Sequence, residues 1–197
     1  MEISGLHPPS LDHVYPVRED SLLLATSAHV RPGERVAEVG CGSGLASLAA
    51  ARSGAQVVAT DLNPYALAGL RDESLRLGLS VLCVRTALLS GLRSFHAILF
   101  NPPYLPTPPG ERDADPWDAL ALDGGPDGQQ TLRRFLASAP THLLPGGRVY
   151  LLWARIRDQE PAESLSSILG REGWKARNVG SRSLPAEELE VLELVRD

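Results

Sequence analysis

The sequence predicts an α/β fold in which a seven-stranded, mostly parallel sheet carries helices on both faces. Two observations support this prediction: short apolar segments alternate with helical segments along most of the chain, and the last two apolar segments have no helix between them. Alternation is typical of parallel sheets, and two closing strands without a helix between them allow the last one to insert antiparallel. Because 197 residues suffice for one core, we expect a single domain over residues 1–197.

Each expected strand is a short, mostly apolar run. The first, "RVAEVG", ends at a glycine, and the fourth, "FHAILF", stops at an asparagine. The expected strands are 35–40, 55–61, 80–86, 95–100, 148–154, 174–181 and 189–196.

Four segments are expected to be helical. The segment 63–78 has the clearest signals, because Asn63 suits the N-cap, Pro64 suits the first helical position and Gly78 ends the pattern. The expected helices are 45–54, 63–78, the part of 126–147 that precedes Ala139, and 160–173. The polar, proline-rich stretch 102–120 is too long for a simple connection, and long loops in compact domains tend to be functional.

Composition and charge argue against several classes of protein. A net charge of −5 argues against a protein that mainly grips a phosphate backbone, although it is compatible with a local basic patch. No apolar run approaches about 20 residues and the chain start lacks the apolar core of a signal peptide, so we expect a cytoplasmic protein without a membrane span. Cys41 and Cys83 are too few for a disulfide framework or a zinc site, and no histidine pairs with cysteine or acid, so no metal is expected.

The stretch "EVGCGSG", residues 38–44, follows the first strand and opens the first helix after it. Gly40, Gly42 and Gly44 allow a tight turn and a close approach of the backbone to a ligand, and the helix start offers free N–H groups. Asp61 closes the second strand about twenty residues later, where a carboxylate can accept hydrogen bonds from both hydroxyls of a ribose. The glycine loop and the acid together predict a cofactor that contains a nucleoside.

Charge near the glycine loop indicates which cofactor this is. A dinucleotide site usually has the spacing G-x-G-x-x-G, whereas this chain has G-x-G-x-G preceded by Glu38. A carboxylate at that place would repel a pyrophosphate, but it suits a positively charged amino group. S-adenosylmethionine has an amino group, a sulfonium and no phosphate, so the pattern favours this methyl donor over NAD.

The stretch "HAILFNPPYLP" predicts a clamp for a planar amine or amide. Pro102 and Pro103 hold the chain in a stiff, extended shape beyond the fourth strand. The side-chain oxygen of Asn101 and the carbonyl oxygen of Pro102 can accept hydrogen bonds from a planar NH₂ group, and Tyr104 can pack against it. Such acceptors hold a poor nitrogen nucleophile and favour positive charge on it.

At this point the sequence resembles a known family. "EVGCGSG" with "NPPY" resembles class I S-adenosylmethionine-dependent methyltransferases that act on planar nitrogens. "ALDGGPDGQQTLRRFL", residues 121–136, resembles HemK-type protein-glutamine methyltransferases, which modify the glutamine of the Gly-Gly-Gln motif in class-1 peptide chain release factors. "HVYPVREDSLLLATSA", residues 13–28, is similar to the short archaeal and eukaryotic subgroup. With residues 1–34 before the first strand, we expect the helical N-terminal domain of bacterial HemK to be absent.

The resemblance implies a Rossmann-like class I methyltransferase fold and a set of residues that hold the methyl donor. Ser21 would contact the donor, Glu38 and Gly40 its amino-acid portion, and Asp61 its ribose, with the segment 1–34 covering the site. The expected cofactor-binding residues are Ser21, Glu38, Gly40, Gly42, Gly44, Asp61, Leu62, Ala87, Leu88 and Asn101.

The resemblance also implies the catalytic residues, of which Asn101 would bind the target amide with Pro102 and Tyr104 beside it. One position departs from the family, which usually has an aspartate that meets the adenine amino group where this chain has Ala87, followed by Leu88. The side-chain acceptor is therefore lost, and we expect weaker affinity for the methyl donor.

Two alternatives to a glutamine methyltransferase stay open. "NPPY" is shared with adenine-N6 methyltransferases of RNA and DNA, although the acidic chain makes nucleic acid an unexpected partner. The loss of the acceptor at Ala87 also permits a non-catalytic scaffold that binds the methyl donor. The family further implies a small zinc-binding activator subunit as a partner. Trp117 is the best candidate for a substrate-side wall, and Gly124, Gly125 and Gly128 form either a turn into a helix or part of a substrate loop.

Overall fold

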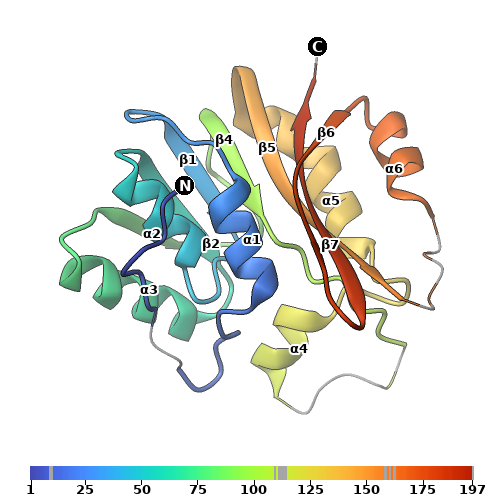
Figure 1. The fold of residues 1–197 in the computed structure, drawn as a ribbon, viewed down its shortest axis with the longest axis horizontal. Coiled ribbons are helices and arrows are strands. Elements are labelled where there is room, and N and C mark those ends of the chain that lie inside the picture. Colours follow the sequence, from blue (N-terminus) through green and yellow to red (C-terminus); the bar gives the residue numbers. More distant parts are fainter. Residues whose placement is uncertain are drawn as a thin grey trace.

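The computed structural model describes residues 1–8, 11–108, 110, 115–157, 159, 161 and 163–196. In these residues seven strands form one sheet in the order β3-β2-β1-β4-β5-β7-β6 (Figure 1). The strands are β1 Arg35–Val39, β2 Gln56–Asp61, β3 Val81–Arg85, β4 Phe95–Phe100, β5 Leu143–Ile156, β6 Lys175–Ser183 and β7 Glu187–Val195. The strands from β3 to β5 pair in parallel, and β7 inserts antiparallel between β5 and β6. The predicted seven-stranded, mostly parallel sheet with an antiparallel last strand is confirmed.

Strand order reverses next to β1, and this reversal positions the site. The chain runs outward from β1 to β2 and β3 and then returns to the other side of β1 with β4. Val39 lies opposite Phe100 in the parallel pair β1–β4 and opposite Thr60 in the pair β1–β2. The loops that follow these strands therefore leave the sheet at one edge, where open α/β folds bind ligands.

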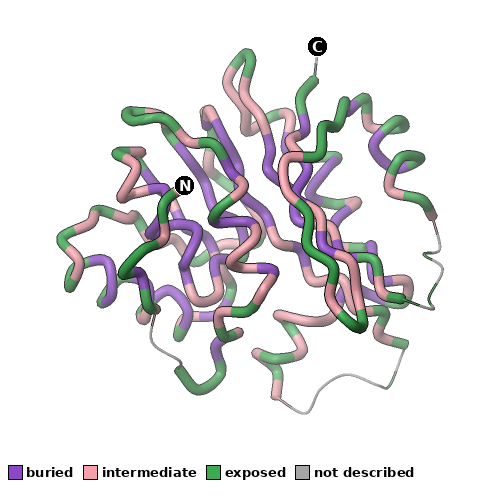
Figure 2. Tube along the Cα trace, in the orientation of Figure 1, coloured by how far each residue is buried: buried purple, intermediate pink, exposed green. Residues whose placement is uncertain are grey.

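Helices cover both faces of the sheet (Figure 1). The helices α1, α2 and α3 share one buried cluster with the sheet, and α5 and α6 share the other. Adjacent strand residues alternate between the two cores, since Val36 and Leu99 point to the first and Ala37 and Ile98 to the second. Figure 2 accordingly shows β1 and β4 as mostly buried. The helices are α1 Glu19–Ser27, α2 Leu45–Arg52, α3 Pro64–Arg76, α4 Pro116–Leu122, α5 Gln130–Ser138 and α6 Leu165–Arg171, with a 3₁₀ turn at Ala139–His142.

The predicted helix at 63–78 is the one that local signals placed best. Asn63 accepts a hydrogen bond of 2.9 Å from the Tyr65 N–H, and Pro64 begins α3. The helix predicted over 160–173 begins at Leu165 in the structure, and residues 160 and 162 lie outside the described residues. Among the described helices the longest, α3, has 13 residues, and none combines the length and apolarity that a membrane span needs.

Three features differ from the prediction. The segment before the first strand contains α1, whose Leu24 and Ala25 are buried although its N-cap residue makes no side-chain hydrogen bond. Tertiary packing therefore stabilises a helix that lacks a side-chain N-cap. The stretch expected as a loop contains α4, and β5 starts at Leu143 because the chain pairs with Phe95 before a register shift restores regular pairing at Arg148.

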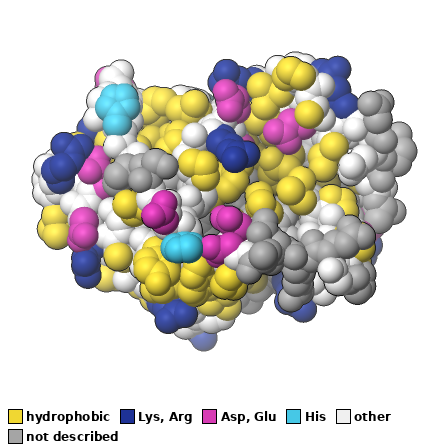
Figure 3. Space-filling view, turned by 90° about the horizontal axis from the view of Figure 1, so that it is seen from below, with side chains coloured by type: hydrophobic (Ala, Val, Ile, Leu, Met, Phe, Trp, Pro, Cys, Tyr) yellow, Lys and Arg dark blue, Asp and Glu magenta, His cyan; other side chains and the backbone are white. Residues whose placement is uncertain are grey.

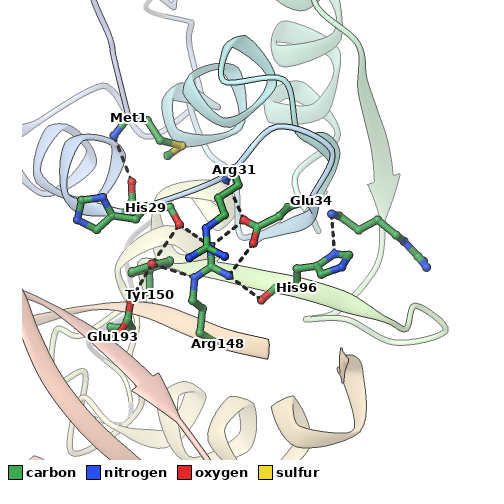
Figure 4. A network of polar contacts seen from close by, with 10 residues as sticks. Met1, His29, Arg31, Glu34, His96, Arg148, Tyr150 and Glu193 are labelled. Atoms are coloured by element: carbon green, nitrogen blue, oxygen red, sulfur yellow. Dashed lines mark hydrogen bonds and ion pairs between the residues drawn. The ribbon is translucent and has the colours of Figure 1, made fainter. Parts of the chain in front are cut away.

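A polar network ties the sheet together at the amino-terminal end of β1 (Figure 4). Arg148 donates hydrogen bonds of 3.0 and 2.7 Å to the two carboxylate oxygens of Glu34 and one of 2.9 Å to the Tyr150 hydroxyl. That hydroxyl donates to Glu193 of β7 at 2.8 Å. The network fixes β5 and β7 to the loop that enters β1. It lies away from the edge of the sheet at which β1, β2 and β4 end.

Candidate active site

A cavity of about 810 Å³ opens at the carboxyl ends of β1, β2 and β4. Its lining comes from α1, from the loops that follow β1 to β4, from α4 and from the start of α5. Figure 3 views the molecule from the end at which α4 lies, and hydrophobic and acidic side chains gather on this face. The cavity contains the predicted residues Ser21, Glu38, Gly40, Gly42, Asp61, Leu62, Ala87, Leu88, Asn101, Pro102 and Tyr104.

Gly44 is the predicted residue that does not belong to the cavity lining. It is the N-cap of α2 with a φ of 77°, and a Cβ atom there would lie 2.5 Å from Cδ1 of Leu70. Glycine at this position lets α2 start close against α3. Gly44 therefore supports the loop whose residues Gly40 and Gly42 line the cavity.

Asp61 links the ends of β1 and β2. Its Oδ2 accepts a hydrogen bond of 3.0 Å from the Gly42 N–H, and its Oδ1 accepts one of 2.9 Å from the Asn63 N–H. Burial raises the pKa of this carboxyl group, and the backbone hydrogen bonds oppose the rise. Each carboxylate oxygen can accept more than one hydrogen bond, so Asp61 retains capacity for two hydroxyl groups of a ligand.

Glu38 is a buried carboxylate at the floor of the cavity. Only 6% of the residue is exposed, and Oε2 accepts a hydrogen bond of 2.8 Å from the Ser47 N–H and another from the Ser47 hydroxyl. Burial is the main reason that the pKa of Glu38 is raised to about 7, and the charge of Asp61 adds to the rise. A cationic group in the cavity would reverse this effect, since an opposite charge nearby lowers the pKa of a carboxyl group.

The loop after β3 passes the cavity through Ala87 and Leu88. Leu88 has a left-handed backbone with a φ of 51°, and its carbonyl oxygen accepts a hydrogen bond of 2.8 Å from the Thr60 hydroxyl. Ala87 lines the cavity without a side-chain acceptor, and Thr86 and Ser90 are the hydroxyl residues beside it in the lining.

The side-chain amide of Asn101 has one end that is hydrogen-bonded and one end that is not. Its Nδ2 donates a hydrogen bond of 2.9 Å to Oδ2 of Asp20. Its Oδ1 is buried and is, among the described residues, the one buried side-chain nitrogen or oxygen atom without a hydrogen-bond partner. Buried acceptors rarely stay unpaired, so this oxygen identifies the place where a ligand group can donate.

Contacts of Tyr104 and Gly128 hold the chain that follows Asn101 in place. The Tyr104 hydroxyl donates a hydrogen bond of 3.2 Å to Glu187 of β7, and burial raises the pKa of Tyr104. A Cβ atom on Gly128, whose φ is 73°, would lie 2.5 Å from the carbonyl oxygen of Tyr104. Of the two roles considered for Gly124, Gly125 and Gly128, the structure shows the turn before α5, packed on the chain that follows Asn101.

The helix α4 forms a wall of the cavity although none of its residues is buried. Trp117 lines the cavity and meets Tyr65 edge-on, with ring centroids 6.0 Å apart. Asp115, the N-cap of α4, lies 2.5 Å from Nδ1 of His13, so α4 is tied to the N-terminal segment. Trp117 therefore belongs to a wall of the cavity, and its role as a substrate-side wall stays a prediction.

The cavity is acidic. Among the described lining residues, Asp20, Glu38, Asp61 and Asp123 carry carboxylates, and Arg134 is the one lysine or arginine. This charge disfavours phosphate-rich ligands and favours cationic or neutral ones. No group of three or more His, Cys, Asp or Glu side chains within the described residues could hold a metal ion.

Sequence reasoning missed Asp20, Tyr15 and Ser47. Asp20 stands directly before Ser21, and it is the carboxylate that contacts Asn101. The one local signal for Asp20 is its position as an acidic residue in the first turn of α1, a helix that the sequence analysis did not predict. Ser47 carries no signal, because its contact with Glu38 depends on how α2 packs on β1.

Comparison with protein families finds the model "Methyltransferase small domain", which matches residues 17–108. A chain of Methanocaldococcus jannaschii assigned to the protein N5-glutamine methyltransferases is 33% identical over 199 residues, covering 100% of this chain and 98% of the relative. The human methyltransferase HEMK2 is 33% identical over 196 residues, covering 93% of this chain and 90% of the relative. The release factor glutamine methyltransferase of Deinococcus radiodurans is 40% identical over 152 residues, but the match spans only 52% of its length.

Solved structures agree on the fold. The E. cuniculi Mtq2-Trm112 complex, described as responsible for methylation of the termination factor eRF1, aligns with a TM-score of 0.70 at 23% identity. That alignment covers 94% of this chain and 99% of the other chain. A methyltransferase from Pyrococcus furiosus aligns with a TM-score of 0.71 at 19% identity over 99% of this chain and 91% of the other.

Proposed function

The chain belongs to the HemK-type protein N5-glutamine methyltransferases, and we propose that it transfers a methyl group from S-adenosylmethionine to a glutamine of a peptide chain release factor. The observation that carries this proposal is the buried Oδ1 of Asn101, an acceptor without a partner among the described residues, on a side chain whose residue lines the cavity. The full-length matches to the archaeal and human relatives support it, and they correspond to the short subgroup of the family.

The cavity suits S-adenosylmethionine by the chemistry of its polar groups. Glu38 offers a buried carboxylate for a positively charged amino group, and Asp61 offers acceptors for ribose hydroxyls. We assign Ser21, Leu62, Ala87 and Leu88 to the rest of the donor site, because they line the same cavity. When bound, the donor supplies a methyl group whose bond to sulfur breaks as its bond to nitrogen forms, and the nitrogen then gives up one proton.

Asn101 and Pro102 hold the acceptor amide in our proposal. An amide nitrogen is a poor nucleophile because its lone pair is delocalised into the carbonyl group. The Oδ1 of Asn101 and the carbonyl oxygen of Pro102 each accept a hydrogen bond from one N–H group of the amide. These hydrogen bonds orient the nitrogen and stabilise the positive charge that develops on it. Tyr104 packs beside the planar group while its hydroxyl is tied to Glu187.

The charge of the cavity favours a protein substrate over a nucleic acid. Four lining carboxylates would repel the phosphates on either side of a flipped adenine, whereas a glutamine in a polypeptide brings no such charge. Adenine-N6 methylation is therefore the second candidate. The N-terminal segment contributes Tyr15, Asp20 and Ser21 to the lining, which supports a role for residues 1–34 in covering the donor.

We also propose an activator subunit and a cytoplasmic location. Among the described strands β3 pairs only with β2, so its other edge is open. Leu82 on β3 and Leu75 on α3 are 60% and 71% exposed, which gives this edge an apolar surface for a partner. The Mtq2-Trm112 neighbour supports a small subunit of that kind.

A methyl-transfer assay with labelled S-adenosylmethionine tests the proposal. The acceptors are a release factor, the same factor with the glutamine of its Gly-Gly-Gln motif replaced by alanine, and an adenine-containing RNA, each with and without a candidate activator. We expect label only on the first acceptor and a rate at least about a hundredfold lower in Asn101→Ala, while calorimetry shows that this variant still binds the donor. Label on RNA would transfer the assignment to adenine, and donor binding without any transfer would favour the scaffold.

A further inference from the structure

Asp20 is a buried carboxylate that contacts the proposed catalytic asparagine from outside the NPPY motif. It is the second residue of α1 and is 3% exposed. Its Oδ2 accepts hydrogen bonds of 2.9 Å from Asn101 Nδ2 and 3.1 Å from the Tyr15 hydroxyl. Its Oδ1 accepts hydrogen bonds of 2.6 Å from the Ser21 N–H and 3.2 Å from the Ser21 hydroxyl. All four contacts are donations to a carboxylate.

This arrangement decides which end of the Asn101 amide is available to a substrate. An ionised carboxylate can only accept hydrogen bonds, so the NH₂ end of Asn101 must face Asp20. The reverse orientation would bring two acceptor oxygens together in a buried site. Oδ1 of Asn101 therefore remains as the free acceptor, in agreement with its lack of a partner among the described residues.

The same contact strengthens the acceptor. A hydrogen bond to a charged group is stronger than one between neutral groups, and chains of hydrogen bonds polarise one another inside a protein. Donation from Nδ2 to Asp20 pushes electron density toward Oδ1 of Asn101. A more negative Oδ1 holds a substrate NH₂ more tightly as the nitrogen gains positive charge in methyl transfer.

We propose that Asp20 is a positioning residue for methyl transfer, which acts through Asn101 by orienting and polarising its amide. The inference rests on the proposed function for its kinetic readout, but the orientation of Asn101 is a property of the protein alone. It also differs from the role expected of its neighbour Ser21, which is to contact the methyl donor.

A double-mutant cycle separates this role from simple stabilisation of α1. The variants are Asp20→Asn, Asp20→Ala, Asn101→Ala and the double variant Asp20→Ala/Asn101→Ala, with Glu19→Gln on the same helix as the control outside the cavity lining. We expect Asp20→Ala to lower kcat about a hundredfold, the order found when one positioned hydrogen-bonding group is removed from an active site. The isosteric Asp20→Asn, which keeps packing but loses the charge, should lower kcat about tenfold.

The decisive result is non-additivity. If Asp20 acts through Asn101, the double variant is no slower than Asn101→Ala alone, and the calorimetric Kd for S-adenosylmethionine stays unchanged in Asp20→Asn. Independent, multiplying losses in kcat, or a loss that appears only as weaker donor binding, would overturn the inference.

The side-chain NH₂ of Asn101 gives a readout that needs no substrate. In ¹⁵N-labelled wild type, its protons should exchange slowly with solvent, and they should lose this protection in Asp20→Ala but not in Glu19→Gln. Protection that survives in a folded Asp20→Ala protein would contradict the orientation. A wild type with protected protons that does not methylate the release factor would instead count against the proposed function alone.

Discussion

The carboxyl group of Glu38 is buried at an energetic cost in the ligand-free protein, and we propose that it binds the amino group of the methyl donor. Its carboxyl group is buried against Ser47, and its pKa is raised from the ordinary 4.5 to about 7. The folded protein therefore binds more protons than the unfolded chain between these values, and folding stability falls as the pH rises through this range. At about 1.4 kcal/mol per pKa unit, the charged Glu38 costs about 3 kcal/mol above pH 7.

Glu38→Gln tests this reasoning because glutamine has nearly the same shape and stays neutral. Its amide oxygen can still accept both hydrogen bonds from Ser47. Urea unfolding should show the variant up to about 3 kcal/mol more stable than wild type at about pH 8, with the difference vanishing as the pH falls to about 4.5. Calorimetry should show that it no longer binds S-adenosylmethionine.

The matched control for Glu38 is Glu19→Gln, which removes one carboxylate from a partly exposed position. It should show neither the stability gain nor the loss of binding. A Glu38→Gln protein that is no more stable at about pH 8, or whose difference from wild type does not depend on pH, would refute the reasoning.

Three further predictions concern the walls of the site and the sheet. Gly128→Ala should destabilise the protein by more than about 2 kcal/mol, because alanine is strained at a φ of 73° and its Cβ would lie 2.5 Å from the Tyr104 carbonyl oxygen. Urea unfolding measures this loss, and an unchanged midpoint would contradict the prediction. Ala87→Asp should tighten S-adenosylmethionine binding about tenfold by calorimetry, since it supplies a charged acceptor in the cavity lining; equal or weaker binding would show that the adenine group lies elsewhere. Arg148→Ala should lower the free energy of unfolding by about 2 kcal/mol, because it leaves Glu34, only 12% exposed, without its ion-pair partner. Donor affinity should not change, and a change in donor affinity without a loss of stability would refute the prediction.

Local sequence signals were sufficient for most of the sheet and for part of the site. The strands near the cavity are short apolar runs that end at glycine, aspartate or asparagine, and the structure places β1, β2 and β4 within one or two residues of the predicted bounds. Once a parallel sheet is assumed, the ends of these strands must meet at one edge. Glu38, Asp61 and Asn101 could therefore be placed together without knowledge of any contact.

Features that depend on packing could not be predicted. The helix α1 lacks a side-chain N-cap and gains its stability from burial of Leu24 and Ala25, so the acids in its first turn are the one local mark of its start. The contact between Asp20 and Asn101 joins residues 81 positions apart, and no motif connects them. By contrast, α4 has a readable start in Asp115 and Pro116, a capping signal obscured by the prolines around it.

Mass spectrometry of the methylated product tests the central claim most directly. A release factor incubated with S-adenosylmethionine and the wild-type protein, with a candidate activator added in parallel, is digested and sequenced by fragmentation. We predict one methyl group on the side-chain nitrogen of the glutamine in the Gly-Gly-Gln motif, and at least about a hundredfold slower methylation by an Asn101→Ala protein that still binds S-adenosylmethionine. A methyl group on another residue, or an Asn101→Ala protein as active as wild type, would contradict the account.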